Sequence, residues 1–95
     1  MRPFIAVIRH EPNIGFCVTF PDLPNCISSG GSLWEARQNA EAALAIYCRQ
    51  LHDAELPIPT PSYLREIAPD QVDGLVALIS PPEDVALPRG LIQVA

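Results

Sequence analysis

The positions of the eleven prolines in this 95-residue chain limit its fold more than any other feature, because only one long stretch contains no proline. Neither proline nor glycine occurs from Ser32 to Asp53. Proline breaks a helix interior because it lacks a backbone N–H and clashes with the preceding turn. Ser32 and Glu35 have the spacing of a capping box, in which each side chain accepts a hydrogen bond from an otherwise unpaired N–H. The sequence therefore predicts one long helix from Ser32 to about Asp53.

The predicted helix has one apolar face. With a turn of about 100° per residue, its apolar side chains recur on one side, and many of them are alanines that let a helix lie close to a sheet. This face comprises Leu33, Ala36, Ala40, Ala43, Leu44, Tyr47 and Leu51. Trp34 and Ile46 fall outside it. They either cover the edge of the sheet or mark a second contact surface, and the sequence leaves both possibilities open.

Short apolar runs on both sides of the helix are typical of strands. Three precede it, at 3–9, 16–20 and 26–28. Pro, Asn and Gly within 11–15 favour a turn, so the first two strands are expected to form an antiparallel hairpin. The run at 75–79 has five consecutive apolar residues, which predicts a strand buried on both faces.

The order β-β-β-α-β predicts an α+β fold, a two-layer domain in which one long helix packs on an antiparallel sheet. We expect residues 1–80 to form this domain. Residues 56–62 have proline at every second position, so they must be extended and cross under or beside the sheet. The helix covers one face of the sheet, and the other face then needs a partner or a polar surface.

The C-terminal tail, residues 81–95, contains an apolar segment that is expected to form a short edge strand. Its candidate oligomer contacts are Leu91, Ile92 and Val94. An apolar edge strand with no cover is a pairing site for another chain. We therefore expect at least a homodimer.

The charge balance argues against direct binding of DNA or RNA. The net charge is −5, and the six basic residues are all arginines that are scattered singly along the chain. Nucleic-acid binders usually carry a basic stripe, whereas an acidic chain is steered towards a basic partner. No run approaches the roughly 20 apolar residues of a membrane span. The N-terminus has no signal-peptide pattern, so a cytoplasmic location is expected.

No residue pattern predicts catalysis, a metal site or a cofactor. The three cysteines, Cys17, Cys26 and Cys48, lack a C-x-x-C motif, and with His10 and His52 they lack zinc-ligand spacing. The cysteines are expected to be reduced thiols. The first two predicted strands carry no carboxylate in their apolar runs, so an array that could hold two catalytic metal ions is not expected.

The segment from Pro21 to Pro24 is the candidate partner-binding loop. Two prolines make it rigid before a partner arrives, which lowers the ordering cost of binding. Asp22 could pair with an arginine or lysine of a basic partner, and Leu23 could fill a pocket. In the alternative reading the loop only positions the third strand, and Leu23 is buried within the domain. Both readings remain open from sequence.

Three blocks in order give the chain a resemblance to the HicB family of antitoxins. They are F-P-D-L-P-N-C at 20–26, E-A-R-Q-N-A-E-A at 35–42 and P-I-P-T-P-S at 57–62. The resemblance covers roughly residues 3–80. Asn25 stands where the family usually has glycine, and asparagine tolerates the left-handed backbone conformation better than most residues.

The resemblance implies a partial RNase H-like fold and a binding role. Family members bind HicA, a small basic toxin that cleaves mRNA, and neutralise it by covering its active surface. They form dimers or tetramers, and many carry a C-terminal DNA-binding module. Only residues 80–95 follow the last predicted strand, so direct DNA binding is not expected.

The leading hypothesis is therefore a non-enzymatic, HicB-like antitoxin. Its candidate partner-binding residues are Pro21, Asp22, Leu23, Pro24, Trp34 and Glu41. The first alternative is an orphan oligomeric scaffold of the same fold with no toxin partner. An RNA-processing enzyme is the less favoured alternative.

Overall fold

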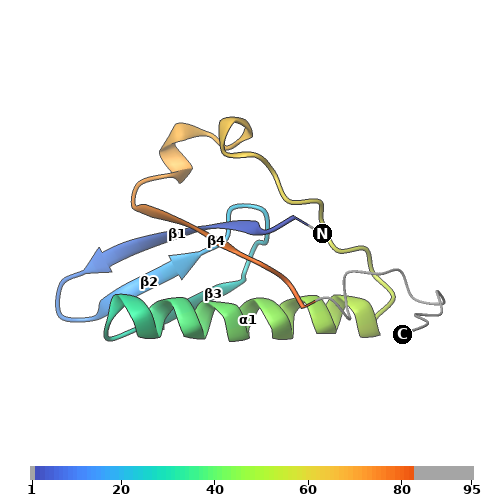
Figure 1. The fold of residues 1–95 in the computed structure, drawn as a ribbon, viewed down its shortest axis with the longest axis horizontal. Helices are drawn as coiled ribbons and strands as arrows, with labels where there is room; N and C mark the ends of the chain where they lie inside the picture. Colours follow the sequence, from blue (N-terminus) through green and yellow to red (C-terminus); the bar gives the residue numbers. More distant parts are fainter. Residues whose placement is uncertain (1, 83–95) are drawn as a thin grey trace.

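A computed structural model describes residues 2–82, and it has the predicted α+β architecture with the element order β-β-β-α-β (Figure 1). The main elements are β1 (Phe4–Glu11), β2 (Gly15–Thr19), β3 (Ile27–Gly30), α1 (Leu33–Asp53) and β4 (Leu75–Ile79). Two single-turn 3₁₀ helices, Leu64–Glu66 and Pro69–Gln71, lie in the connection between α1 and β4. The predicted contacts at Leu91, Ile92 and Val94 lie outside the described residues.

The sheet is antiparallel throughout, with the strand order β3-β2-β1-β4. β1 is central, so that its Val7 lies opposite Thr19 of β2 on one side and Val76 of β4 on the other. The first two strands form the predicted hairpin, with Asn13 in the left-handed region at φ 68°. β3 and β4 are consequently the two edges of the described sheet.

α1 begins at the predicted capping box. The Ser32 Oγ accepts a hydrogen bond from the Glu35 N–H at 3.1 Å, and the Glu35 Oε1 accepts one from the Gly31 N–H at 2.9 Å. These bonds satisfy donors that a helix start leaves unpaired. The helix ends at Asp53, where the Ala54 N–H still reaches the Gln50 carbonyl.

The main core lies between α1 and the sheet. The buried side chains of this core come from alternate positions of the strands and from one face of the helix, because side chains repeat every two residues in a strand and about every 3.6 residues in a helix. Its members include Phe4, Ala6, Ile8, Val18, Phe20, Ala36, Ala40, Leu44 and Cys48. Leu33 is 43% exposed, although the helical pattern placed it on this face, because it stands at the first residue of the helix. Cys48 is fully buried beside the predicted stripe.

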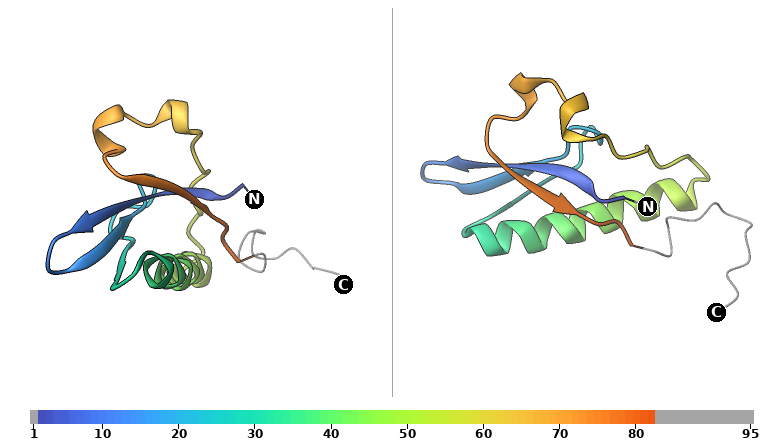
Figure 2. Two further views of the ribbon diagram at one scale, coloured as in Figure 1. Left: turned by 60° about the vertical axis from the view of Figure 1, so that its left-hand side comes forward. Right: turned by 45° about the horizontal axis from the view of Figure 1, so that its top comes forward.

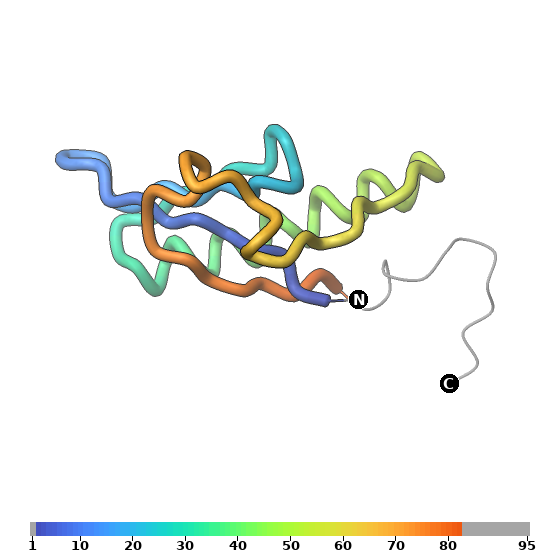
Figure 3. Tube along the Cα trace, turned by 90° about the horizontal axis from the view of Figure 1, so that it is seen from above, coloured from blue at the N-terminus to red at the C-terminus, as the bar shows by residue number. Residues whose placement is uncertain are grey.

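Over β1, the second face of the sheet is covered by the chain itself, whereas the sequence suggested a partner or a polar surface there. The connection that follows α1 crosses this face, so that the sheet lies between α1 and the connection (Figures 1, 2 and 3). Ile5 and Val7 of β1 point to this side and are buried. Pro61 and Ile67 of the connection are also buried. The predicted extended segment therefore completes a second, smaller core.

The expectation that 75–79 is buried on both faces is wrong. Leu75, Val76 and Leu78 are 56%, 41% and 56% exposed. The reason is the position of β4 at the sheet edge, since α1 packs mainly beneath β2 and β3 and the connection covers β1. The prediction of a strand is confirmed, but the sequence does not show that the strand lies at an edge of the sheet.

The two buried thiols predict a loss of stability at alkaline pH. Burial, and secondarily the nearby Cys48, raises the pKa of the Cys26 thiol from 9.0 to about 11; burial also raises the pKa of Cys48. The folded chain therefore holds protons that the unfolded chain loses first. The free energy of unfolding should fall as pH rises from about 9 to 11, by roughly 2–3 kcal/mol for Cys26. It should be unaffected by this thiol below pH 8.

Urea unfolding measured across this range tests the prediction, and a comparison of cysteine variants assigns the effect to one thiol. Cys26→Ala should flatten the pH dependence, and Cys17→Ala, at a half-buried position, is the control that should leave it unchanged. An alkaline slope that persists in Cys26→Ala would assign the effect to other groups.

Candidate partner-binding surface

The loop after β2 is built from two consecutive tight turns. The Leu23 N–H donates to the Phe20 carbonyl at 3.0 Å, and the Cys26 N–H donates to the Leu23 carbonyl at 3.1 Å. Asn25 has φ 70°, so it adopts the left-handed conformation expected of a residue in the glycine position. Leu23 is only 1% exposed and belongs to the main core. This geometry supports the reading in which Leu23 anchors the loop.

Asp22 is bound to the proline-spaced segment forty residues away. Its Oδ2 accepts the Ser62 N–H at 2.7 Å and its Oδ1 accepts the Ser62 hydroxyl at 2.7 Å. Both carboxylate oxygens therefore already have an internal partner. Both segments belong to the blocks that resemble the HicB family, but the sequence did not predict that the two segments bind each other. The only available signal was that each block combines rigid prolines with polar side chains.

The loop is also tied to α1. The Tyr47 hydroxyl donates to the Pro24 carbonyl at 3.1 Å. Pro21 is half-buried, whereas Pro24 is exposed at the tip of the loop. The arrangement holds the start of β3 between the helix and the connection. A partner contact by Pro21, Asp22, Leu23 or Pro24 stays a prediction, and of these Pro24 is the most accessible.

Trp34, Arg37 and Glu41 form the second candidate region, which we call the α1 flank. Their spacing of three and four residues places them on one side of the helix. Trp34 is 70% exposed. The Arg37 Nε lies 3.6 Å from the Glu41 Oε1, and the Arg37 Nη2 donates to the Leu78 carbonyl of β4 at 3.1 Å. The bond to the Leu78 carbonyl shows that the α1 flank faces the β4 side of the molecule.

The predicted partner-binding residues fall into two separate groups. The loop contacts α1 at Tyr47, which is about 20 Å along the helix axis from Trp34 at 1.5 Å per residue. The structure thus does not bring Trp34 and Glu41 together with the loop. Trp34 and Glu41, with exposed side chains, remain predicted partner contacts at one end of the helix.

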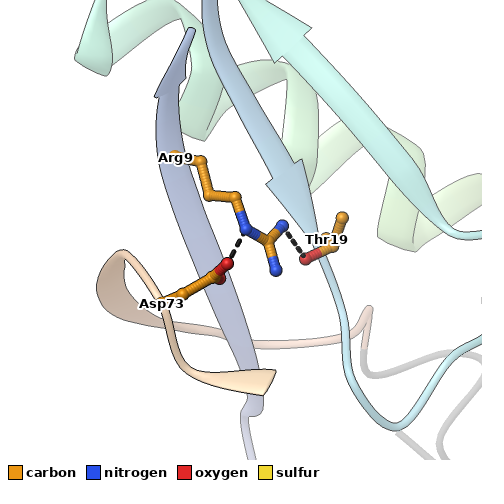
Figure 4. Close-up of polar contacts among 3 residues, drawn as sticks. All are labelled: Arg9, Thr19 and Asp73. Atoms are coloured by element: carbon orange, nitrogen blue, oxygen red, sulfur yellow. Dashed lines mark hydrogen bonds and ion pairs between the residues drawn. The ribbon is translucent and has the colours of Figure 1, made fainter. Parts of the chain in front are cut away.

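A third polar group lies on the sheet face opposite α1 (Figure 4). The Arg9 guanidinium forms an ion pair with Asp73 and donates to the Thr19 hydroxyl at 3.1 Å. This contact joins β1 and β2 to the end of the connection, just before β4. Its role is to fix where β4 starts.

Two kinds of site bear on the function of the described residues, a cluster of metal-ligating side chains and a helix that could span a membrane. Within residues 2–82, no three His, Cys, Asp or Glu side chains are grouped so that they could share a metal ion. Over the same residues, no helix has both the length and the apolar character needed to cross a bilayer. The described residues do present an exposed tryptophan, a paired charge and an apolar strand at the sheet edge.

Comparison with known proteins agrees with this fold. Residues 4–85 match the family described as the HicB-like antitoxin of bacterial toxin–antitoxin systems. A protein of Haemophilus phage HP1, described as an uncharacterized 14.9 kDa protein in the rep-hol intergenic region, is 34% identical over 71 residues. These residues make up 70% of this chain and 52% of the phage protein, so the chain spans about half the length of that relative.

Solved antitoxin structures share the fold at low sequence identity. The Burkholderia pseudomallei antitoxin HicB superposes with a TM-score of 0.78 at 22% identity, over 100% of this chain and 75% of that one. Antitoxin HicB3 gives a TM-score of 0.73 at 21% identity, over 100% and 71%. A chain of the HicA3–HicB3 toxin–antitoxin complex gives 0.65 at 23% identity, over 86% and 99%. The family match covers most of the chain, and the chain belongs to the HicB-like antitoxin family of bacterial toxin–antitoxin systems.

Proposed function

We propose that this chain is an antitoxin that binds a small basic mRNA-cleaving toxin of the HicA type and neutralises it by covering its active surface. The observation that carries the proposal is the antitoxin-family match over residues 4–85. It is supported by a structural relative that was solved as a complex of HicA3 and HicB3. In this role the chain acts by binding and not by catalysis, and a partner that cleaves mRNA places its action in the cytoplasm.

The charge of the chain favours a basic partner. A net charge of −5 attracts a cationic protein and speeds encounter, and this attraction weakens as salt screens it. The α1 flank offers the best single anchor, because Trp34 is exposed and tryptophan is among the residues that dominate binding energy at interfaces. We therefore place the toxin contact on the α1 flank, with Trp34 packing against the toxin and Glu41 facing a cationic side chain.

Trp34→Ala is expected to weaken toxin binding by about 30-fold, the effect of losing roughly 2 kcal/mol at a buried aromatic contact. Isothermal calorimetry with a purified, catalytically inactive HicA-type toxin measures this change. Ile46→Ala is the matched control, since Ile46 is 59% exposed on the same helix but on the side away from the flank. Equal toxin affinity of the two variants would mean that the toxin contact lies outside the α1 flank. Absence of binding by the unaltered chain would favour the orphan scaffold.

A further inference from the structure

A recess lies at the corner of the sheet where β1 runs on past the start of β4. β4 pairs with β1 only as far as Leu75, which stands opposite Ile8, whereas β1 continues along β2 to Glu11. The recess has a volume of about 380 Å³, within the range of roughly 300–1,000 Å³ that is usual for ligand pockets. It therefore has room for a side chain of a partner.

The backbone of His10 faces this recess. The Glu11 carbonyl accepts the Ile14 N–H of the hairpin turn at 3.1 Å, so the backbone of Glu11 faces β2. Because successive strand residues direct their backbone groups to opposite sides, the N–H and carbonyl of His10 point away from β2. Among residues 2–82, the register of β1 with β4 gives His10 no partner. Its carbonyl is thus an acceptor that borders the recess.

The side chains of the recess offer further acceptors. The Arg9 guanidinium is paired with the Asp73 Oδ1 and also donates to the Thr19 hydroxyl. Within the described part of the chain, neither the Asp73 Oδ2 nor the half-buried Glu11 carboxylate has a hydrogen bond or an ion pair. The recess therefore holds two carboxylates and one guanidinium, which leaves one negative charge in excess.

The walls next to these acceptors are apolar. They are formed by Ile8, Phe16 and Leu75, of which Leu75 is 56% exposed. The Phe16 ring lies beside the His10 ring, with centroids 4.9 Å apart. This combination fits a long side chain whose methylene stem packs on apolar surface while a cationic head reaches acceptors. A guanidinium suits it best, because it is planar, has five donors and no acceptor, and stacks on aromatic rings.

We propose that this recess binds an arginine side chain of the toxin, an inference that deepens the proposed function and rests on it. The guanidinium of that arginine pairs with the Glu11 carboxylate and donates to the His10 carbonyl and the Asp73 Oδ2. Its methylene stem packs against Phe16 and Leu75. The excess negative charge of the recess is neutralised when the arginine enters.

The recess and the α1 flank lie at the same end of the molecule. Phe16 at the start of β2 pairs with Gly30, the last residue of β3, and α1 begins shortly afterwards at Leu33. Figure 1 shows the β1–β2 hairpin, the start of β4 and the start of α1 together at the left-hand end. One toxin can therefore contact Trp34 and place an arginine in the recess.

Glu11→Gln is expected to weaken toxin binding at least about tenfold, because it removes the charge of the recess and keeps the size of the side chain. Isothermal calorimetry with the catalytically inactive toxin measures this change. Asp70→Asn is the matched control, since it alters the net charge equally at an exposed position outside the recess. If folded Glu11→Gln binds as tightly as Asp70→Asn, the proposal is overturned and the proposed function is not affected.

A titration without toxin separates the two proposals. N-acetyl-arginine amide is added to the isotope-labelled full chain, and nuclear magnetic resonance follows the signals of His10, Glu11 and Leu75. Saturable shifts are expected with the arginine amide and not with the neutral citrulline amide. Such shifts in a chain that binds no toxin would contradict the proposed function alone and leave the arginine site.

Absence of these shifts at tens of millimolar arginine amide, or equal shifts with citrulline amide, would overturn the proposal. Equally strong binding of lysine amide would overturn the assignment to arginine. Residues 83–95 are present in the titrated chain, so a recess that the chain itself fills would give the negative result.

Discussion

Gly30→Ala should destabilise the fold by about 3 kcal/mol, at the upper end of the usual cost of overpacking. A Cβ at Gly30 would lie 2.4 Å from the Ala36 backbone nitrogen and 2.8 Å from its Cα. Both atoms belong to the first turn of α1, so no flexible side chain can move aside. Either the helix start must shift or β3 must leave its place in the sheet.

The neighbouring glycine provides the control. A Cβ at Gly31 would have only the Glu35 Oε1 near it, at 3.8 Å, which is ordinary contact. Urea unfolding should therefore show a large decrease in the free energy of unfolding for Gly30→Ala and little change for Gly31→Ala. Equal costs for the two substitutions would mean that the helix does not lie against β3 as described.

Asp22→Ala is expected to cost about 2–4 kcal/mol of stability, because it removes two hydrogen bonds to a charged acceptor and leaves the part-buried Ser62 N–H without a partner. Ser62→Ala should cost less, since its backbone N–H still reaches the carboxylate. A double-mutant cycle between the two positions, measured by urea unfolding, should give a coupling energy above about 0.5 kcal/mol.

The same substitution separates the two readings of the loop. If Asp22 acts mainly within the fold, Asp22→Ala lowers stability strongly, and under conditions where the variant is folded it binds the toxin nearly as well as the unaltered chain. Additive effects in the cycle, together with a large loss of toxin affinity in folded protein, would instead make Asp22 a direct partner contact.

Local rules predicted the local elements well. Ser32 and Glu35 define the helix start in sequence as they do in the structure, because a capping box needs only neighbouring residues. The glycine-like conformation of Asn25 follows from the same kind of local preference. The strands agree with the predicted runs to within a few residues, since alternation and turn chemistry are also short-range signals.

Properties that depend on long-range packing were not predictable in this way. The apolar run of β4 has the composition of a buried strand, and only the strand order shows that it is an edge. The Asp22–Ser62 contact joins residues forty positions apart. Similarly, no local signal says that the proline-spaced connection covers Ile5 and Val7, because that depends on the route of the chain across the sheet.

The central claim is that the chain inhibits a toxin by binding it, and titration into an RNA-cleavage reaction tests this most directly. A HicA-type toxin is held at fixed concentration with an mRNA substrate while the purified chain is added. The account predicts that cleavage falls to background near one antitoxin chain per toxin, and that inhibition is weaker at high salt. Undiminished cleavage at a large excess of folded chain would contradict it.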